Sequence, residues 1–153
     1  MATPRFELFT GPTNIEQHPE ANSQSFLRGD LVYLSSSQVT VCNGTGIGAS
    51  GIYGVAMKNA VNNSVNAMTP VSVISPDQIW RCFPTSTITP STDLSIGVDY
   101  QIKQTAVGAG ELTDSAGTDA VVRSWLYKNS TGATAGDPVY ISFDSTACQA
   151  SEG

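Results

Sequence analysis

Charged side chains are scarce in this chain. Asp, Glu, Lys and Arg account for 13% of its residues, whereas soluble domains average roughly 25%. The seven cations stand singly along the sequence, and the net charge is −6. Nucleic-acid binding needs clustered Lys and Arg that displace counterions from phosphates, and an anionic membrane surface attracts the same kind of cluster. We therefore expect neither nucleic acid nor a membrane as a partner.

Groups that carry out catalysis or bind metals are equally rare. His18 is the only histidine, and it lies in a Pro-rich stretch that we do not expect to hold a base in a fixed geometry. No serine has the Gly-x-Ser-x-Gly surroundings of a nucleophile elbow. Glu111, Asp114 and Asp119 cluster without the spacing of a calcium loop. The sequence predicts no catalytic residue, no metal and no cofactor.

Cysteine is present only at positions 42, 82 and 148. An odd number at such wide spacings fits neither a disulfide framework nor a zinc site, so we expect reduced thiols. A bridge between Cys42 and Cys82 stays open, because both fall in expected strands. The first residues, MATPRFELFTGP, hold no apolar segment of a secretory signal, and no run approaches the roughly 20 apolar residues of a membrane span.

A short signature occurs twice, as GDLVYLS at residues 29–35 and as GDPVYIS at residues 136–142. Glycine supplies the unusual φ of a tight turn, and aspartate bonds its own backbone just downstream. The β-branched and aromatic residues that follow suit a half-buried strand. Each signature therefore predicts a structural turn that starts a strand. The turn residues are Gly29, Asp30, Gly136 and Asp137.

Two familiar motifs coincide with expected turns and loops. Arg28-Gly29-Asp30 spells the integrin tripeptide, but its Gly and Asp already serve the first turn. Residues 46–51, GIGASG, match a dinucleotide-binding pattern, yet IYGVAM follows where that pattern requires a helix. We interpret the tripeptide as part of the turn and the Gly-rich segment as a hairpin loop.

From Phe26 onward, apolar and polar residues alternate with a period of two. Such alternation is typical of half-buried antiparallel strands, and many short strands favour a barrel or a sandwich. We predict an all-β fold, a small antiparallel β-barrel or sandwich, over residues 26–153. Ala56 to Ala67 is the one stretch with a possible short helix. The expected strands lie at 31–34, 39–41, 52–57, 71–75, 78–83, 98–102, 121–127 and 139–143.

Residues 1–25 differ from the rest, because three prolines leave little room for a long regular element. Two interpretations stay open: an extended N-terminal arm that docks on a partner, or an edge strand followed by a loop. In either case Phe6 and Leu8 share one face, and Glu7 and Phe9 the other. As an arm, the segment would contact its partner through Arg5, Phe6, Leu8 and Phe9.

One pattern within residues 26–75 resembles the opening of tailed-phage capsid decoration, or cement, proteins. It consists of Phe26, Gly29, Asp30, Val32, Leu34 and Val39, a Gly-rich loop, and Gly54-Val55-Ala56. The resemblance implies a small β-barrel-like domain without catalytic residues, made in the host cytoplasm. It would bind the major capsid protein on the exterior of the virion, commonly as a homotrimer. The acidic charge suits an exterior position better than the DNA-filled interior.

Two alternatives come from other classes of protein. A glycan- or host-binding domain of a viral fibre or bacterial surface needs aromatic faces for sugar rings. A small β-barrel enzyme needs a pocket with convergent polar groups, which the lack of catalytic histidine disfavours. The aromatic candidates for sugar stacking are Trp80, Tyr100, Trp125 and Tyr127.

Overall fold

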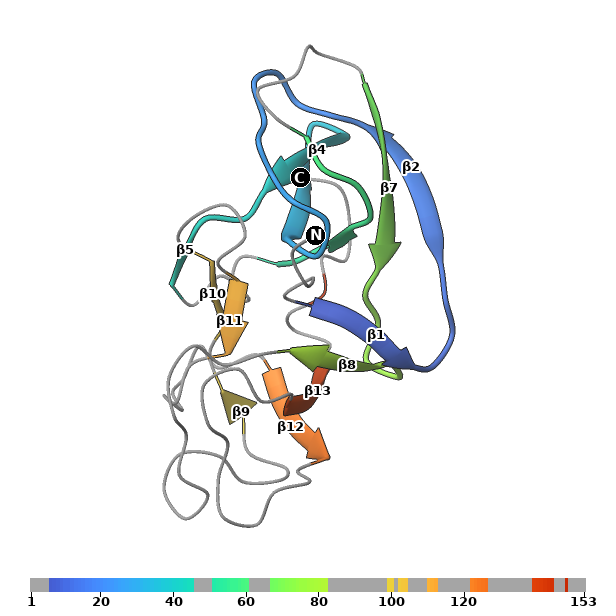
Figure 1. The fold of residues 1–153 in the computed structure, drawn as a ribbon, viewed down its shortest axis with the longest axis vertical. Coiled ribbons are helices and arrows are strands. Elements are labelled where there is room, and N and C mark those ends of the chain that lie inside the picture. The colour runs from blue at the N-terminus through green and yellow to red at the C-terminus, as the bar shows by residue number, and fades with distance from the viewer. Residues whose placement is uncertain are drawn as a thin grey trace.

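The computed structural model describes residues 6–45, 51–60, 67–82, 99–100, 102–104, 110–112, 122–126, 139–144 and 148. Over these residues every regular element is a β-strand, which confirms the all-β prediction (Figure 1). The strands are β1 (Phe6–Thr10), β2 (Ile15–Pro19), β3 (Leu31–Ser35), β4 (Gln38–Val41), β5 (Gly44–Thr45), β6 (Gly54–Ala56), β7 (Met68–Val73), β8 (Ile79–Cys82), β9 (Asp99–Tyr100), β10 (Ile102–Gln104), β11 (Gly110–Leu112), β12 (Val122–Leu126) and β13 (Val139–Phe143).

The strands form two five-stranded sheets and one three-stranded sheet. The upper sheet of Figure 1 has the order β2-β7-β6-β3-β4, and the lower sheet has the order β1-β8-β13-β12-β9. Strands β11, β10 and β5 form the small third sheet. Adjacent strands within each sheet are antiparallel. A parallel bridge between Glu20 and Val39 connects the end of β2 to β4 without closing the upper sheet into a barrel.

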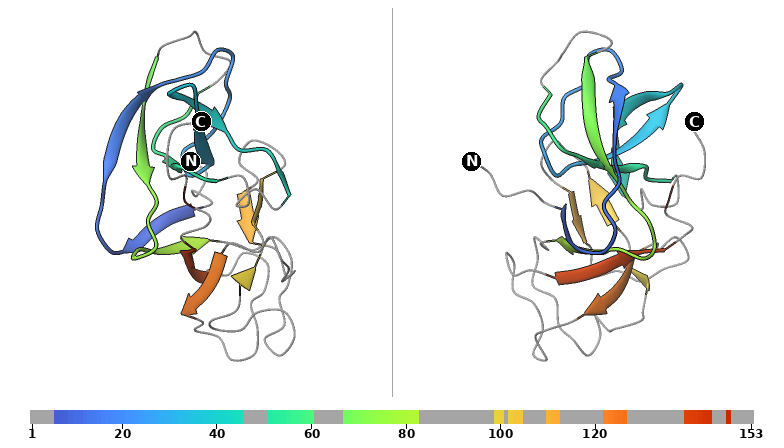
Figure 2. Two further views of the ribbon diagram at one scale, coloured as in Figure 1. Left: turned by 180° about the vertical axis from the view of Figure 1, so that it is seen from behind. Right: turned by 90° about the vertical axis from the view of Figure 1, so that its right-hand side faces the viewer.

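Two connections between consecutive described strands pass directly from one large sheet to the other, from β1 to β2 and from β7 to β8 (Figure 2). The buried amide of Gln78 holds both crossings together. Its side-chain nitrogen, Nε2, donates to Pro12 O at 2.7 Å and to Val73 O at 3.2 Å. Its Oε1 accepts from Ser75 N at 2.8 Å and from the Trp80 indole at 3.1 Å. All four hydrogen-bonding positions of the amide are therefore used.

Two apolar cores follow from this arrangement. The first lies between the upper and lower sheets, and the second lies on the other face of the upper sheet. Strand β3 contributes to both, because Leu31 enters the first core while Val32 and Leu34 enter the second. This explains why its sequence, LVYL, is continuously apolar. The first core contains Phe6, Leu31, Cys42, Ile52, Val55, Ile74, Trp80, Cys82, Ile102, Val139, Ile141 and Phe143.

The Gly29–Asp30 turn fixes the start of β3 against β6. Gly29 has φ +97°, and its N–H donates to Ala56 O at 2.9 Å. Asp30 Oδ2 accepts from Leu27 N at 2.9 Å. Since Asp30 is fully buried, the Arg28-Gly29-Asp30 tripeptide presents no carboxylate to solvent. The second signature's turn, Gly136 and Asp137, lies outside the described residues, although β13 begins two positions after Asp137.

The N-terminal segment lies within the sheets. Strand β1 pairs with β8, and β2 pairs with β7. Phe6 is 1% exposed in the first core, with Leu8 packed against it. This differs from the expectation of a separate docking arm and matches the edge-strand alternative, because the chain's own core removes the Phe6 ring from water. Phe6 is thus unavailable as a partner contact in this conformation, whereas Phe9 is 53% exposed. Arg5 lies outside the described residues.

The structure also answers two further expectations, a short helix after Ala56 and a disulfide between Cys42 and Cys82. The possible helix over Ala56 to Ala67 is absent from its described first part, because Ala56 ends β6 and Ala60 forms an antiparallel bridge to Phe26. All three cysteines lie in the described part of the chain and none forms a disulfide, so Cys42 and Cys82 are not bridged. Burial, with the nearby Asp30 charge, raises the pKa of Cys42 to about 12.

Gly29→Ala should lower the free energy of unfolding by about 1–2 kcal/mol, because an L side chain is strained at positive φ. Chemical denaturation of both proteins measures the difference. The neighbouring change Arg28→Ala, at an exposed position, should stay within about 0.5 kcal/mol and serves as the control. Equal stability of the Gly29→Ala and wild-type proteins would contradict the structural role of the turn.

Candidate functional site

An apolar strip runs along the exposed edge of the upper sheet. In the antiparallel pair β2–β7, Ile15 lies opposite Ser72 and Pro19 lies opposite Met68, so these side chains share one face. Ile15 is 51% exposed and Met68 is 49% exposed. Pro70, opposite Gln17, lies on the same face. We call Ile15, Pro19, Met68 and Pro70 the outer strip.

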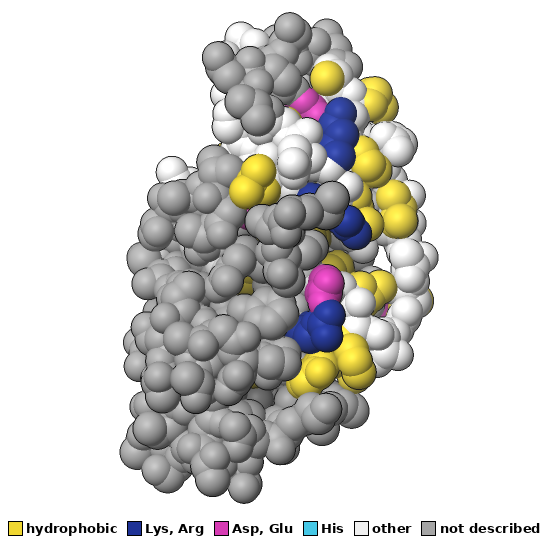
Figure 3. Space-filling view, in the orientation of Figure 1, with side chains coloured by type: hydrophobic (Ala, Val, Ile, Leu, Met, Phe, Trp, Pro, Cys, Tyr) yellow, Lys and Arg dark blue, Asp and Glu magenta, His cyan; other side chains and the backbone are white. Residues whose placement is uncertain are grey.

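The outer strip continues the face that forms the first core. Val55 and Ser72 are paired on this face of the upper sheet, and both are buried where the lower sheet covers it. Farther along β7 the lower sheet no longer covers the face, and Met68 is left exposed. Figure 3 shows hydrophobic side chains along the right-hand edge of the molecule, over the elements β7, β2 and β1. The strip itself contains no charged residue, which suits contact with another protein.

Phe9 adds a second exposed apolar group on β1. Its ring meets that of Tyr140 edge-on, with the ring centroids 4.7 Å apart. The Tyr140 side chain is 5% exposed, so Phe9 covers it from solvent. Phe9 is the one member of the expected contact set that is both described and exposed.

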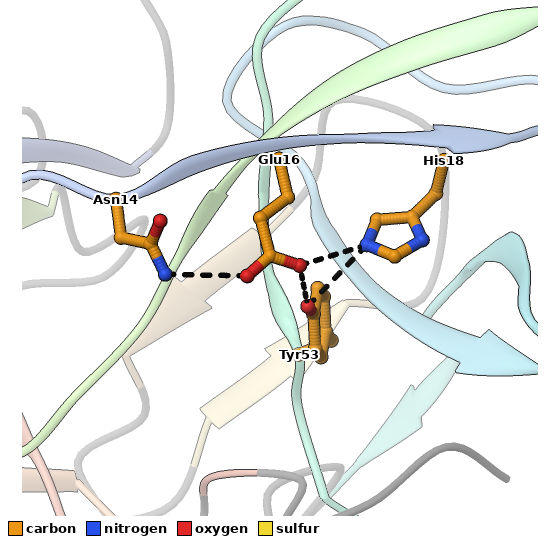
Figure 4. Close-up of polar contacts among 4 residues, drawn as sticks. All are labelled: Asn14, Glu16, His18 and Tyr53. Atoms are coloured by element: carbon orange, nitrogen blue, oxygen red, sulfur yellow. Dashed lines mark hydrogen bonds and ion pairs between the residues drawn. The ribbon is translucent and has the colours of Figure 1, made fainter.

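A polar cluster lies on the opposite face of β2 (Figure 4). The Tyr53 hydroxyl donates to Glu16 Oε1, and His18 Nε2 lies 3.0 Å from the same oxygen. Asn14 Nδ2 donates to Glu16 Oε2 at 3.3 Å. The His18 and Tyr53 rings meet edge-on at 5.3 Å. The expectation that His18 lacks a fixed geometry is therefore wrong, because β2 is a paired strand and Tyr53 supports the ring.

The chemistry of this cluster favours a structural role for Glu16. The hydrogen bond from Tyr53, followed by that from His18, lowers the pKa of the Glu16 carboxyl group. A carboxylate with a lowered pKa remains ionised at neutral pH and is a weak proton acceptor there. Glu16 therefore acts as an anchor that ties β2 to the residue preceding β6.

Glu16→Gln should lower the melting temperature at pH 7, and the difference from wild type should shrink as the pH falls towards 3. The lowered pKa means that ionised Glu16 stabilises the fold above its ordinary titration range and loses this effect on protonation. Since the side chain is 41% exposed, the gain is below about 1 kcal/mol. Tyr53→Phe should show the same pH trend, whereas Tyr33→Phe, outside the cluster, should not. A pH-independent difference would contradict this assignment.

A second carboxylate, Glu20, is buried at the end of β2. It is 1% exposed and accepts a hydrogen bond from the Thr69 hydroxyl. Lys58 Nζ lies 3.2 Å from the same oxygen. The backbone N–H of Glu20 donates to Ala67 O at 2.7 Å. The buried charge is thus both paired and hydrogen-bonded, as buried charges require.

Thr69→Val should lower the free energy of unfolding by about 1–3 kcal/mol, because it keeps the shape of the side chain but removes a donor from a buried carboxylate. Denaturant titration measures the effect. Thr40→Val is the matched control, since the Thr40 hydroxyl makes only a 3.4 Å contact to Gln38 O. Equal losses for the two variants would show that Glu20 does not depend on Thr69.

The described residues include no group of three or more His, Cys, Asp or Glu that could hold a metal ion. Over the same residues, no helix is long and apolar enough to cross a membrane. Trp80 is buried against Phe143, with the ring centroids 6.0 Å apart, and presents no face to a sugar. The other aromatic candidates, Tyr100, Trp125 and Tyr127, have side chains outside the described part.

The sequence matches no family model and no curated protein. The function is therefore argued from the surfaces and clusters of this chain. Sequence patterns alone did not reveal the outer strip, because Ile15 and Met68 are 53 positions apart and share one face only through the β2–β7 pairing. The apolar residues that the sequence singled out in the Pro-rich segment, Phe6, Leu8 and Phe9, are not part of the strip.

Proposed function

We propose that this chain is a structural virion protein that binds the outer surface of a tailed-phage capsid and stabilises the shell. The observation that carries the proposal is the outer strip, an exposed and uncharged apolar face on a folded β-domain. A protein that reinforces a shell needs such a contact face, and it does not need a catalytic pocket. The partner would be the major capsid protein.

The resemblance to decoration proteins supports this choice over other binding functions. Its residues lie on β3, β4 and β6, which are adjacent in the upper sheet, and in the segment that leads into β3. The Gly54-Val55-Ala56 segment is fully buried there. A Cβ atom at Gly54 would lie 2.4 Å from Ser72 O, so the close approach of β6 to β7 requires glycine. The pattern thus belongs to the sheet that carries the outer strip.

The proposed protein acts as a homotrimer at a symmetry axis of the shell. Oligomers usually adopt closed symmetry, and a surface with few charges lowers the desolvation cost of contacts between copies. The net charge of −6 suits the exterior of a shell that encloses DNA. The alternative, a glycan- or host-binding domain, loses one of its stacking candidates because Trp80 belongs to the first core.

Purified protein should add saturably to shells of the same virus that lack it, at a fixed number of copies per shell. Met68→Asp should weaken this addition at least tenfold, because a charge in the outer strip must be desolvated on binding. Ser35→Asp places the same charge at an exposed site on β3 and should bind as wild type does. Sedimentation of shells with bound protein measures both.

Two results separate the parts of the proposal. If wild-type protein does not add to shells at any concentration, the capsid function is wrong. If wild type binds and Met68→Asp binds equally well, the function stands and the outer strip is not the contact face. Melting curves show whether the variants are folded, and a half-exposed position such as Met68 should change them little.

A further inference from the structure

A pocket of about 50 Å³ opens where β1 meets the upper sheet. Phe6, Leu8, Val55 and Trp80 supply apolar walls, and Arg28 lies at the lining together with Gly29. A single water needs roughly 10–15 Å³ of such space, so the pocket has room for the end of an aliphatic side chain. Its position between the sheets places it next to the face that continues into the outer strip.

The pocket is preformed by the Gly29–Asp30 turn. No side chain projects from Gly29, and its positive φ disfavours one. The turn is fixed in place because Gly29 N donates to Ala56 O and Ala56 N donates to Asp30 O, both at 2.9 Å. Ala56 also lines this side of the pocket. A ligand would therefore meet a shape that needs no rearrangement.

The charges around the pocket favour an anion. Three cations have described side chains, Arg28, Lys58 and Arg81, and Figure 3 shows Lys and Arg side chains on the face that it draws. Lys58 pairs with Glu20, and Arg81 pairs with Glu7, whose side chain also lines the pocket. Among the described residues, no carboxylate pairs with the exposed guanidinium of Arg28. A carboxylate beside the pocket would supply that missing partner, and arginine binds carboxylates in a planar, two-bond geometry.

We propose that this pocket is a docking site for a partner segment in which an aliphatic side chain stands next to a carboxylate. The aliphatic group fills the space against Trp80 and Val55, and the carboxylate binds Arg28. The identity of the partner as the capsid shell rests on the proposed function, whereas the chemistry of docking rests on the pocket. Phosphate groups fit poorly, because the walls are apolar and the rim offers one arginine without a carboxylate partner.

N-acetyl-leucine is a minimal probe, since it combines an isobutyl group with a carboxylate. Its addition to the full chain should shift the NMR signals of the Trp80 indole N–H and of Arg28 saturably in the millimolar range. N-acetyl-leucinamide, which lacks the charge, and N-acetylglycine, which lacks the isobutyl group, should each bind at least threefold more weakly. The Trp80 signal reports the pocket, because Trp80 is among its lining residues.

Variants assign the two parts of the site. Arg28→Gln should reduce the affinity for N-acetyl-leucine to that of the amide, whereas Arg28→Lys, which keeps the positive charge, should retain a preference for N-acetyl-leucine over the amide. Leu8→Phe, which fills part of the pocket from a half-buried position, should abolish the Trp80 shift. Saturable binding that Arg28→Gln does not weaken, or no saturable Trp80 shift with N-acetyl-leucine, overturns the proposal.

Shell binding distinguishes this inference from the proposed function. If wild type adds to shells and Arg28→Gln adds at least tenfold more weakly, the pocket takes part in attachment. If both add equally well, the pocket inference fails and the capsid function stands. If wild type binds N-acetyl-leucine with the expected selectivity but never adds to shells, the capsid function fails and the docking chemistry stands.

Discussion

The arrangement of the two large sheets depends on the side-chain amide of Gln78. This one group bonds the β1–β2 crossing through Pro12, the end of β7 through Val73, and the indole of Trp80. Each hydrogen bond contributes only about 0.5–1.5 kcal/mol net, but leaving one buried group without a partner costs about 1–3 kcal/mol. The placement of the two large sheets is therefore constrained, because each donor and acceptor of the buried Gln78 amide needs a hydrogen-bond partner. The orientation of Trp80, and with it the wall of the pocket, follows from the same bonds.

A second buried glutamine extends the same principle to the third sheet. Gln104, on β10, accepts from Leu31 N at 2.8 Å and donates to Leu31 O at 2.9 Å and to Cys42 O at 2.8 Å. Its side chain thus bonds backbone groups of β3 and of the residue after β4 in the way a neighbouring strand would. A neutral amide can be buried at far lower cost than a charge. The chain therefore joins its sheets with buried glutamine amides, in keeping with its low content of charged residues.

Local patterns in the sequence were sufficient to predict most individual strands. The β-branched and aromatic residues of Leu31–Ser35 and Val139–Phe143 favour a strand through the composition of each segment alone. The N-terminal segment was harder, because the alternation of Phe6 and Leu8 fits a docking arm and an edge strand equally well. Only the long-range pairing with β8 distinguishes them. For the same reason the contact between Glu16 and Tyr53 leaves no trace in the sequence.

Cys82 lies directly opposite Phe6 in the β1–β8 pair and has no exposed surface. A thiol reagent can reach such a sulfur only when the covering strand leaves, because reaction requires both access and the thiolate. The rate at which Cys82 is alkylated therefore measures how often β1 opens. Cys42 lies in the same core, but its backbone bonds Leu31 and Gln104 rather than β1, and its high pKa keeps it protonated, so it provides an internal reference for opening of the whole core. The protein thus contains two natural labels that separate fraying of its first strand from global unfolding.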